Sequence, residues 1–202
     1  MVVRHPRDAG RGPRERRHSA PYGDPMTFRA DDRIYVDESK ARGYFIVGTG
    51  VQTALVPACE RAIRSLVKPG QRRIHFTNES DSRRRHLLAC MARLDVRCAV
   101  WIAEGLPDKA ARPLTLSALV ESAVSARAAR LIVERDASVE KADRRIITET
   151  LRRRSAIVPF VHAAPHEHPL LWVSDAVAWC YSRGGDWVRR VEPLVRHRTT
   201  RL

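Results

Sequence analysis

The stretch "DDRIYVDESKARGYFIVGTG", residues 31–50, indicates how the fold begins. It contains two apolar-rich runs, "RIYVDES" and "GYFIVGTGV", on either side of the short segment Lys40–Gly43. Two such runs separated by a few residues that include Gly predict a β-hairpin. The first predicted strand ends in two adjacent acids, Asp37 and Glu38, although the chain is strongly basic. Adjacent acids at the end of a strand are unexpected in a chain with this much positive charge, so they are candidates for a specific role.

Length and charge limit the class of protein. The 202 residues are enough for one domain with a substantial core. The chain has 37 Lys and Arg against 23 Asp and Glu, which gives a formal net charge of +14. A positive field of this size attracts polyanions, most often nucleic acid. Because almost all the excess is Arg, a compositional bias without functional meaning is the alternative interpretation.

The cysteines and the apolar segments predict the compartment. Cys59, Cys90, Cys98 and Cys180 are far apart and form no C-x-x-C pair, which favours reduced thiols and a cytoplasmic location. The first 25 residues contain no apolar core of a secretory signal, and no apolar window is long enough to span a bilayer. The sequence therefore predicts an intracellular protein without a membrane partner. It does not determine the oligomeric state.

Composition divides the chain into three parts. Residues 1–32 are rich in Arg, Gly and Pro without an apolar period, which is typical of a disordered basic leader. This leader is either a phosphate-binding segment or a surplus start, since Met26 is a plausible alternative initiator. Residues 33–187 are predicted to form the domain, and residues 188–202 a basic C-terminal tail.

Hydrophobic periodicity predicts the elements that follow the hairpin. Helices are expected in residues 57–68, 80–94, 114–129, 138–154, 170–183 and 186–198, and strands in residues 72–76, 96–105, 130–136 and 156–163. A hairpin followed by strands that alternate with helices is typical of an α/β fold with a mixed sheet and flanking helices.

Carboxylates fall at the ends of apolar elements. Asp37 ends the first strand, Glu134 and Asp136 end the strand "RLIVERD", and Asp175 lies in the apolar helix "LLWVSDAVAW". A lone buried carboxylate costs several kcal/mol, so such acids need a partner or a cation. Acids that converge suit Mg²⁺ or Mn²⁺. The alternatives are a turn for Asp37, an ordinary strand exit for Glu134 and Asp136, and a helix-dipole preference for Asp175.

Four segments together resemble a known family. "YVDES", "RIHFTNES", "LIVERD" and "PLLWVSDAVAW" are similar to the domain-of-unknown-function 3800 family, over residues 33–187. The resemblance implies a ribonuclease H-like fold and a two-metal nuclease that hydrolyses phosphodiesters of RNA or DNA with Mg²⁺ or Mn²⁺. A catalytically inactive nucleic-acid-binding protein on the same fold is the alternative function, and an adaptor for an acidic protein is a third.

The resemblance also implies site residues. Asp37, Glu134 and Asp175 match the metal-binding acids, and Glu79 in "IHFTNES" is the candidate for a further catalytic carboxylate. The sequence departs from the family at Lys40, where Gly is usual, and at Glu134, where Asp is usual. On a regular strand Asp37 and Glu38 point to opposite faces, so we expect Asp37 to be the ligand.

Basic and histidine-rich segments complete the set of candidates. Residues predicted to contact nucleic acid are Lys40, Arg83, Arg84, Arg144 and Arg145, although charge runs on helices are also ordinary solvated faces. The segment "VHAAPHEHP" carries three histidines, His162, His166 and His168, and Cys180 follows. These four residues could bind zinc. Because the segment has no recognised spacing, we expect solvent-exposed histidines, one of which could shuttle a proton at the metal site.

Overall fold

The hairpin expected from residues 31–50 forms the centre of the sheet. In the computed structural model, which describes residues 27–202, β1 (Asp32–Ser39) pairs antiparallel with β2 (Tyr44–Gln52). The chain reverses through Arg42 and Gly43, whose φ angles are +61° and +124°. The predicted leader lies mostly outside the described residues. Its boundary at residue 32 is too late, because Phe28 is buried and Asp32 already belongs to β1.

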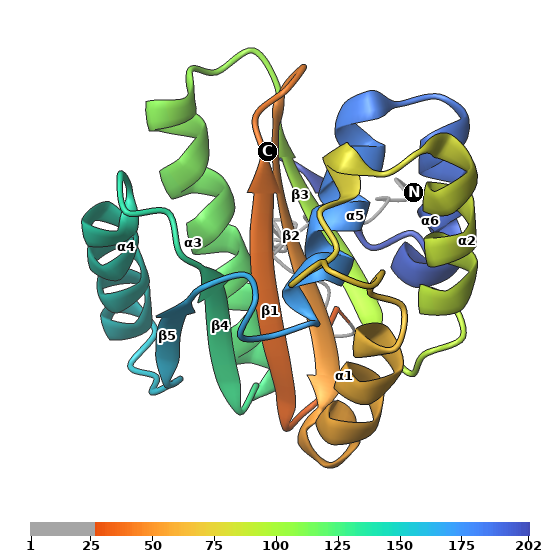
Figure 1. Ribbon diagram of the computed structural model, residues 1–202. Helices are drawn as coiled ribbons and strands as arrows, with labels where there is room; N and C mark the ends of the chain where they lie inside the picture. The colour runs from red at the N-terminus through yellow and green to blue at the C-terminus, as the bar shows by residue number, and fades with distance from the viewer. Residues whose placement is uncertain (1–26) are drawn as a thin grey trace, which may run out of the picture.

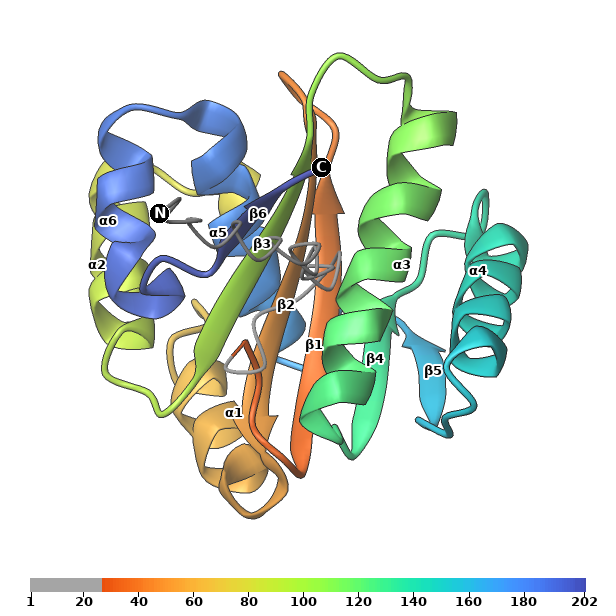
Figure 2. The same cartoon turned by 180° about the vertical axis from the view of Figure 1, so that it is seen from behind.

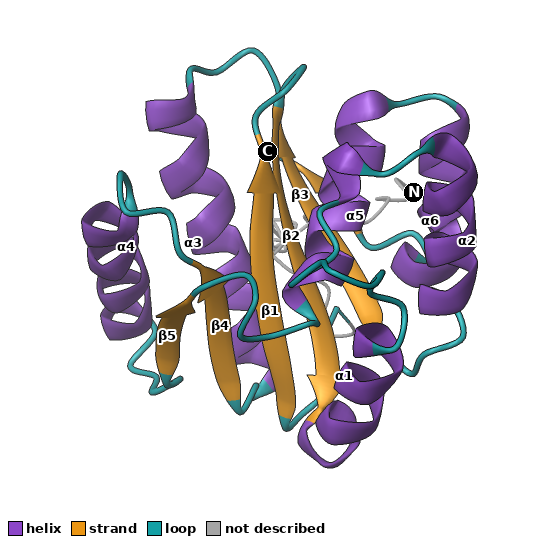
Figure 3. Cartoon of the chain, viewed as in Figure 1, coloured by secondary structure: helices purple, strands orange, loops and turns teal. Residues whose placement is uncertain are grey.

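The sheet has six strands in the order β5-β4-β1-β2-β3-β6. Figures 1 and 3 show the first five of these strands, and Figure 2 shows β6 next to β3. The other strands are β3 (Arg97–Ala103), β4 (Arg130–Glu134), β5 (Phe160–Ala163) and β6 (Thr199–Arg201). β3 is antiparallel to β2, whereas β4 is parallel to β1, β5 to β4 and β6 to β3. The predicted mixed α/β sheet is therefore confirmed.

Helices cover both faces of the sheet. α3 (Asp108–Ala126) and α4 (Glu140–Arg153) lie on one face, which Figure 2 shows in front. The opposite face carries α1 (Val56–Arg64), α2 (Asp81–Met91), α5 (Leu171–Arg183) and α6 (Asp186–Val195) (Figure 1). β1 alternates between these layers: Tyr35 packs into the core on the α5 side, and Ile34 and Val36 into the core on the α3 side.

Gly48 and Gly50, the two glycines of "VGTG", allow the Phe28 ring to pack closely against β2. A Cβ atom on Gly48 would lie 2.9 Å from the ring of Phe28, and one on Gly50 would lie 2.8 Å from the same ring. Both distances are shorter than side-chain contacts allow, so these positions on β2 need glycine for packing.

The segment expected as a strand at residues 72–76 is irregular, so this prediction was wrong. Residues 76–78 form a short 3-10 helix instead. The backbone N–H of Phe76 donates to Asp175 Oδ2 at 2.9 Å, and its carbonyl accepts from Arg84 Nε at 2.9 Å. Side chains thus satisfy the backbone groups that a neighbouring strand would otherwise bind.

The segment predicted as a C-terminal tail, residues 188–202, contains most of the helix expected in residues 186–198 and one further strand. α6 buries Val191, Leu194 and Val195 in the core on the α5 side, and β6 extends the sheet beyond β3. Apolar residues at a helical spacing are therefore enough to fold this basic segment onto the domain. No helix between residues 27 and 202 is both long and apolar enough to cross a bilayer.

Candidate active site

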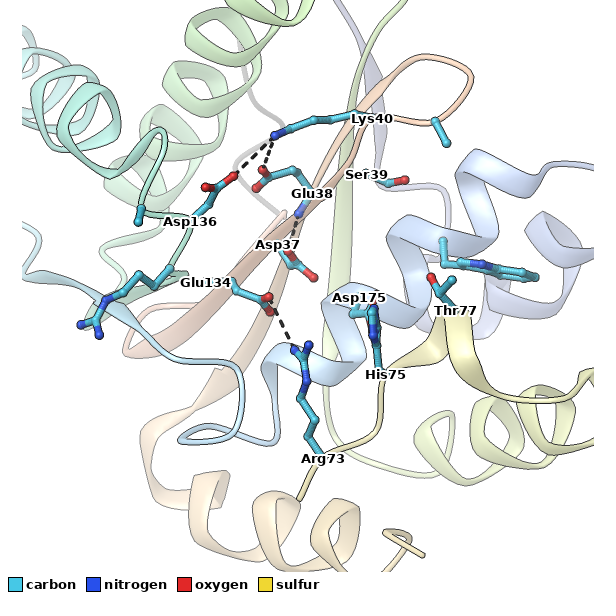
Figure 4. Close-up of a pocket in the computed structure, with 14 residues that line it drawn as sticks. Asp37, Glu38, Ser39, Lys40, Arg73, His75, Thr77, Glu134, Asp136 and Asp175 are labelled. Carbon is cyan, nitrogen blue, oxygen red and sulfur yellow. Dashed lines mark hydrogen bonds and ion pairs between the residues drawn. The ribbon is translucent and has the colours of Figure 1, made fainter. Parts of the chain in front are cut away.

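Three predicted acids meet at one edge of the sheet. Val36 pairs with Val133 on the parallel strands β1 and β4, so Asp37 and Glu134 follow as the next residue on each strand. α5 crosses β1 and β2 on the same face and brings in Asp175 (Figure 4). Parallel pairing and helix packing together bring close three residues that are up to 138 positions apart in the chain.

The three acids line a cavity of about 610 Å³. Its lining residues come from β1 and the following turn, the segment before α2, the loop after β4, and α5. They are Asp37, Glu38, Ser39, Lys40, Ala41, Arg73, His75, Thr77, Glu134, Arg135, Asp136, Ala137, Asp175 and Trp179. Acids lie between basic residues in this cavity, and Figure 4 shows Lys40 and Arg73 on opposite sides of them.

Hydrogen bonds fix the two aspartates. The backbone N–H of Glu38 donates to Asp37 Oδ1 at 2.8 Å, and that of Phe76 donates to Asp175 Oδ2 at 2.9 Å. Beside Asp175, the Ser174 hydroxyl donates to the Tyr35 carbonyl at 2.8 Å, which fastens α5 to β1. The positions of both carboxylates are therefore set by backbone groups and by packing.

The acids repel one another. Burial raises the pKa of Asp37 well above its ordinary value, and the charges of Glu134, Asp175 and Glu38 raise it further. Burial and then the charge of Asp175 raise the pKa of Glu134 to about 7, although Arg73 at 3.8 Å opposes this. Burial also raises the pKa of Asp175, against the opposing effects of the Phe76 N–H and His75. A bound cation would relieve this repulsion.

The donor set fits a hard divalent cation. No three His, Cys, Asp or Glu side chains in residues 27–202 are already arranged around one point as a metal cage. Mg²⁺ does not need such a cage, because it keeps several waters and binds through one or two carboxylates together with substrate phosphates. Three carboxylates around an open, polar cavity meet that requirement, and they do not suit a closed zinc site.

Glu79 lies apart from these acids. Its buried carboxylate accepts a hydrogen bond from Lys68 Nζ at 2.6 Å, and the residue lines a second cavity of about 240 Å³ that contains neither Asp37, Glu134 nor Asp175. The charge of Glu79 is balanced by Lys68. The fourth catalytic carboxylate implied by the family resemblance is therefore not brought to the site by this fold.

Glu38 points to the other face of β1, as strand alternation predicts. Its Oε1 lies 2.7 Å from Arg112 Nη1, and Arg112 also donates to both carboxylate oxygens of Asp143 at 2.6 Å and to the Tyr44 hydroxyl at 2.7 Å. We call these four residues, Glu38, Tyr44, Arg112 and Asp143, the Arg112 cluster. Their ion pairs and hydrogen bonds hold the C-terminal end of β1 on the α3 face of the sheet.

The basic residues predicted near β1 and on α2 have partners within the fold. Lys40 lies at the cavity, 3.4 Å from Glu38 and 3.6 Å from Asp136. Arg83 donates to the Leu66 carbonyl. Arg84 donates to two carbonyls of the 3-10 helix and places its guanidinium 4.2 Å from the centre of the Trp179 ring. Arg83 and Arg84 thus stabilise the segment before α2.

Arg144 and Arg145 lie on α4, on the opposite side of the sheet from α5. Arg144 donates to Glu140 at 2.7 Å, and Arg145 lies 3.6 Å from Glu149. Both side chains are exposed, and neither residue lines the acidic cavity.

The expectation of exposed histidines was wrong for His162. This residue is buried on β5, and its Nε2 lies 3.5 Å from Asp143 Oδ2. The parallel pairing of β5 with β4 turns its side chain toward α4. His166 is exposed, and His168 lies 3.3 Å from Glu60. None of these histidines lines the acidic cavity, so none is placed to shuttle a proton there.

Sequence reasoning did not assign several residues of the cavity to the site, among them Arg73, His75, Thr77 and Trp179. The first three belong to the segment that begins with the expected strand, and its irregular path is what turns them toward the acids. Trp179 had a readable signal, because it follows Asp175 by four positions on the same helix and therefore lies on the same face.

Comparison with known proteins gives a likeness in fold. No family model matches the chain, and no curated protein sequence matches it. Among solved structures, ribonuclease HII from Archaeoglobus fulgidus, determined in complex with PCNA, is similar with a TM-score of 0.53 and 16% identity, covering 80% of this chain and 76% of that one. The chain therefore has a ribonuclease H-like fold, and the likeness at this identity establishes the fold alone.

Two structures of Bst-RNase HIII are also similar, each with a TM-score of 0.48. One is of a mutant, with 14% identity, covering 76% of this chain and 52% of that one. The other is a complex with Mn²⁺, with 13% identity, covering 77% of this chain and 53% of that one.

Proposed function

We propose that this protein is a divalent-metal-dependent nuclease that hydrolyses phosphodiester bonds of RNA or DNA. The observation that carries the proposal is the convergence of Asp37, Glu134 and Asp175 in one cavity, where burial raises the pKa of each and the charges of neighbouring acids raise those of Asp37 and Glu134 further. Acids in a cleft whose pKa values are perturbed by burial and by neighbouring charges are candidates for a functional site. The ribonuclease H-like fold and the resemblance to the domain-of-unknown-function 3800 family agree with this assignment.

The acids are the proposed ligands of Mg²⁺ or Mn²⁺. Asp37 and Asp175 are held by backbone N–H groups, so each keeps the orientation that ligation needs. Glu134 is held only by Arg73, at 3.8 Å, among the described residues. Divalent ions bound by these residues would stabilise the charge that develops during an in-line displacement at phosphorus.

Basic residues line the cavity together with the acids. Arg73, Arg135 and Lys40 place positive charge around the acids and oppose the repulsion between a carboxylate-lined site and a polyanion. His75 lies in the cavity near Asp175 and is the side chain there best suited to transfer a proton to a leaving oxygen.

Cleavage of labelled oligonucleotides tests the proposal. Single-stranded RNA, single-stranded DNA and an RNA–DNA hybrid would be incubated with the full chain in Mg²⁺, in Mn²⁺ and in EDTA. We expect cleavage with metal and none with EDTA. Asp37→Asn, Glu134→Gln and Asp175→Asn should each lower the rate on the order of 100-fold or more, because each removes a charged ligand.

Two matched variants show whether the effect belongs to the site. Glu104→Gln removes an exposed carboxylate that pairs with Arg201, and it should leave the rate unchanged. Glu79→Gln tests the fourth carboxylate, and from its pairing with Lys68 we expect only a small loss. Calorimetric titration with Mn²⁺ gives a second readout. If the chain binds nucleic acid but neither binds metal nor cleaves, the proposal of a nuclease is overturned and a catalytically inactive nucleic-acid-binding protein is the function that remains.

A further inference from the structure

The second cavity adjoins the acidic one. It has a volume of about 240 Å³ and is lined by residues 71–73 together with His75, Asn78 and Glu79; we call it the loop cavity. Arg73 and His75 line both cavities. A polymer bound at the acids can therefore continue into the loop cavity without leaving the surface of the same loop.

The loop cavity carries unbalanced positive charge. Arg72 is exposed and makes no hydrogen bond or ion pair with any residue of the described chain. The nearby acid, Glu79, is balanced by Lys68 at 2.6 Å. Within residues 27–202, Arg73 has one ion-pair partner, Glu134 at 3.8 Å, which is itself a proposed metal ligand. The side chains of Gln71 and Asn78 add amide groups that can donate and accept hydrogen bonds.

The opposite wall of the acidic cavity differs in this respect. Lys40 lies within 3.6 Å of both Glu38 and Asp136. Arg135 lies 3.5 Å from Glu140 and also donates to the His162 carbonyl at 2.9 Å. Acids of the protein already balance the cations on this wall, so it attracts a phosphate less than the loop side does.

We propose that the loop cavity binds the part of the nucleic-acid strand adjacent to the scissile phosphodiester, with Arg72 contacting a backbone phosphate. The substrate would then pass over residues 71–79 and not over the Lys40 turn. This inference deepens the proposed function and rests on it for the position of the scissile bond. The binding itself requires only that the ligand be a polynucleotide.

Salt-dependent binding tests the contact without any need for cleavage. Affinity of the full chain for a short fluorescent single-stranded oligonucleotide would be measured by anisotropy in EDTA over a series of KCl concentrations. Loss of one phosphate contact lowers the slope of log K against log[salt] by about 0.7 for a single strand. We expect this change for Arg72→Gln, with affinity roughly fivefold weaker at low salt.

Two variants with the same change of charge provide the comparison. Arg152→Gln removes an exposed arginine at the far end of α4, and Lys40→Gln removes the paired cation on the opposite wall. We expect no change in slope for Arg152→Gln and a smaller one for Lys40→Gln than for Arg72→Gln. Equal effects of Arg72→Gln and Arg152→Gln would overturn the proposal, as would a larger effect of Lys40→Gln.

The outcomes also separate this inference from the proposed function. If Arg72→Gln weakens binding while the wild-type chain cleaves nothing with Mg²⁺ or Mn²⁺, the loop cavity binds nucleic acid and the proposed nuclease activity is wrong. If the wild type cleaves and Arg72→Gln leaves both the salt slope and KM unchanged, the nuclease activity is supported and the proposed binding of nucleic acid in the loop cavity is wrong. A rise in KM with kcat unchanged supports both.

Discussion

Two groups of acids lie on opposite faces of β1, and they differ in their counter-charge. On the α5 face, Asp37, Glu134 and Asp175 repel one another, and the pKa of each is raised. On the α3 face, Arg112 donates to both carboxylate oxygens of Asp143 at 2.6 Å. Burial acts to raise the pKa of Asp143, but the hydrogen bonds from Arg112, with a contribution from His162, hold it below its ordinary value. Asp37 and Glu38 are neighbours in sequence, yet each belongs to a different group.

The difference shows how to tell a structural acid from a functional one. A buried acid with a complete partner, such as Asp143, holds elements together, and its charge is already satisfied. Buried acids whose charge is not fully balanced lower stability, and such a cost persists in proteins mainly at functional sites. Substitutions and changes of pH test this contrast between the two groups of acids.

Loss of the cation from the Arg112 cluster should have the largest effect. Arg112→Met leaves Asp143 buried without its partner, so the free energy of unfolding should fall by about 3–5 kcal/mol. Urea denaturation followed by circular dichroism measures this. Arg145→Met, on an exposed face of α4, is the matched control. A loss below that of the control would show that the Arg112 cluster does not stabilise the fold.

The pH dependence of Mn²⁺ binding should be the next largest effect. The pKa of Glu134 is raised to about 7, so its carboxyl is mostly protonated at pH 6 and mostly ionised at pH 8. Because the metal competes with this proton, Mn²⁺ affinity should rise about tenfold over that interval. Calorimetric titration at several pH values checks this, and an affinity independent of pH would contradict it.

The same shifts give the two groups opposite effects on the stability of the metal-free protein. For the α5 group the folded state binds more protons than the unfolded chain between pH 4.5 and about 7, so its contribution to the free energy of unfolding falls as pH rises through that range. The lowered pKa of Asp143 contributes stability that is present above its ordinary value of 3.8 and is lost as pH falls below it. Melting temperatures measured in EDTA across pH 3–8 should therefore show two effects: a contribution from the α5 group that decreases as pH rises from 4.5 to about 7, and a contribution from Asp143 that decreases as pH falls below 3.8.

Removal of one repelling charge should stabilise the metal-free protein. Asp37→Asn eliminates the repulsion with Glu134 and Asp175, so at pH 8 in EDTA the free energy of unfolding should increase by on the order of 1 kcal/mol, the equivalent of one pKa unit. The same variant should lose Mn²⁺ binding. A destabilised variant would mean that Asp37 serves the fold and would weaken the contrast between the two groups.

Loss of an exposed ion pair should have the smallest effect. Arg145 lies 3.6 Å from Glu149, and both side chains are exposed, so Arg145→Gln should change the free energy of unfolding by less than about 0.5 kcal/mol. Urea denaturation provides the measurement. A loss as large as that of Arg112→Met would mean that burial does not separate the two kinds of ion pair in this protein.

Local patterns in the sequence were sufficient to predict the hairpin and most helices, and they marked Asp37, Glu134, Asp136 and Asp175 as acids within or at the ends of apolar elements. Alternation in "RIYVDES" and helical spacing in "LLWVSDAVAW" follow from the period of strand and helix. Alternation along β1 also predicts that Asp37 and Glu38 point to opposite faces, and their different partners agree with this. The partners of Asp37 and Asp175 were predicted only through the resemblance to a family, because spacing in sequence does not show which strand ends meet.

Long-range contacts account for the features that local patterns did not predict. The irregular path of residues 72–76 follows from the bonds of Phe76 to Asp175 and Arg84, one of them 99 residues away in sequence, and it is what brings Arg73 and His75 to the cavity. The burial of His162 depends on the pairing of β5 with β4, and the pairing of Glu79 with Lys68 removes it from the site. In each case the tertiary structure supplies a partner from another part of the chain, and a local pattern contains no record of that partner.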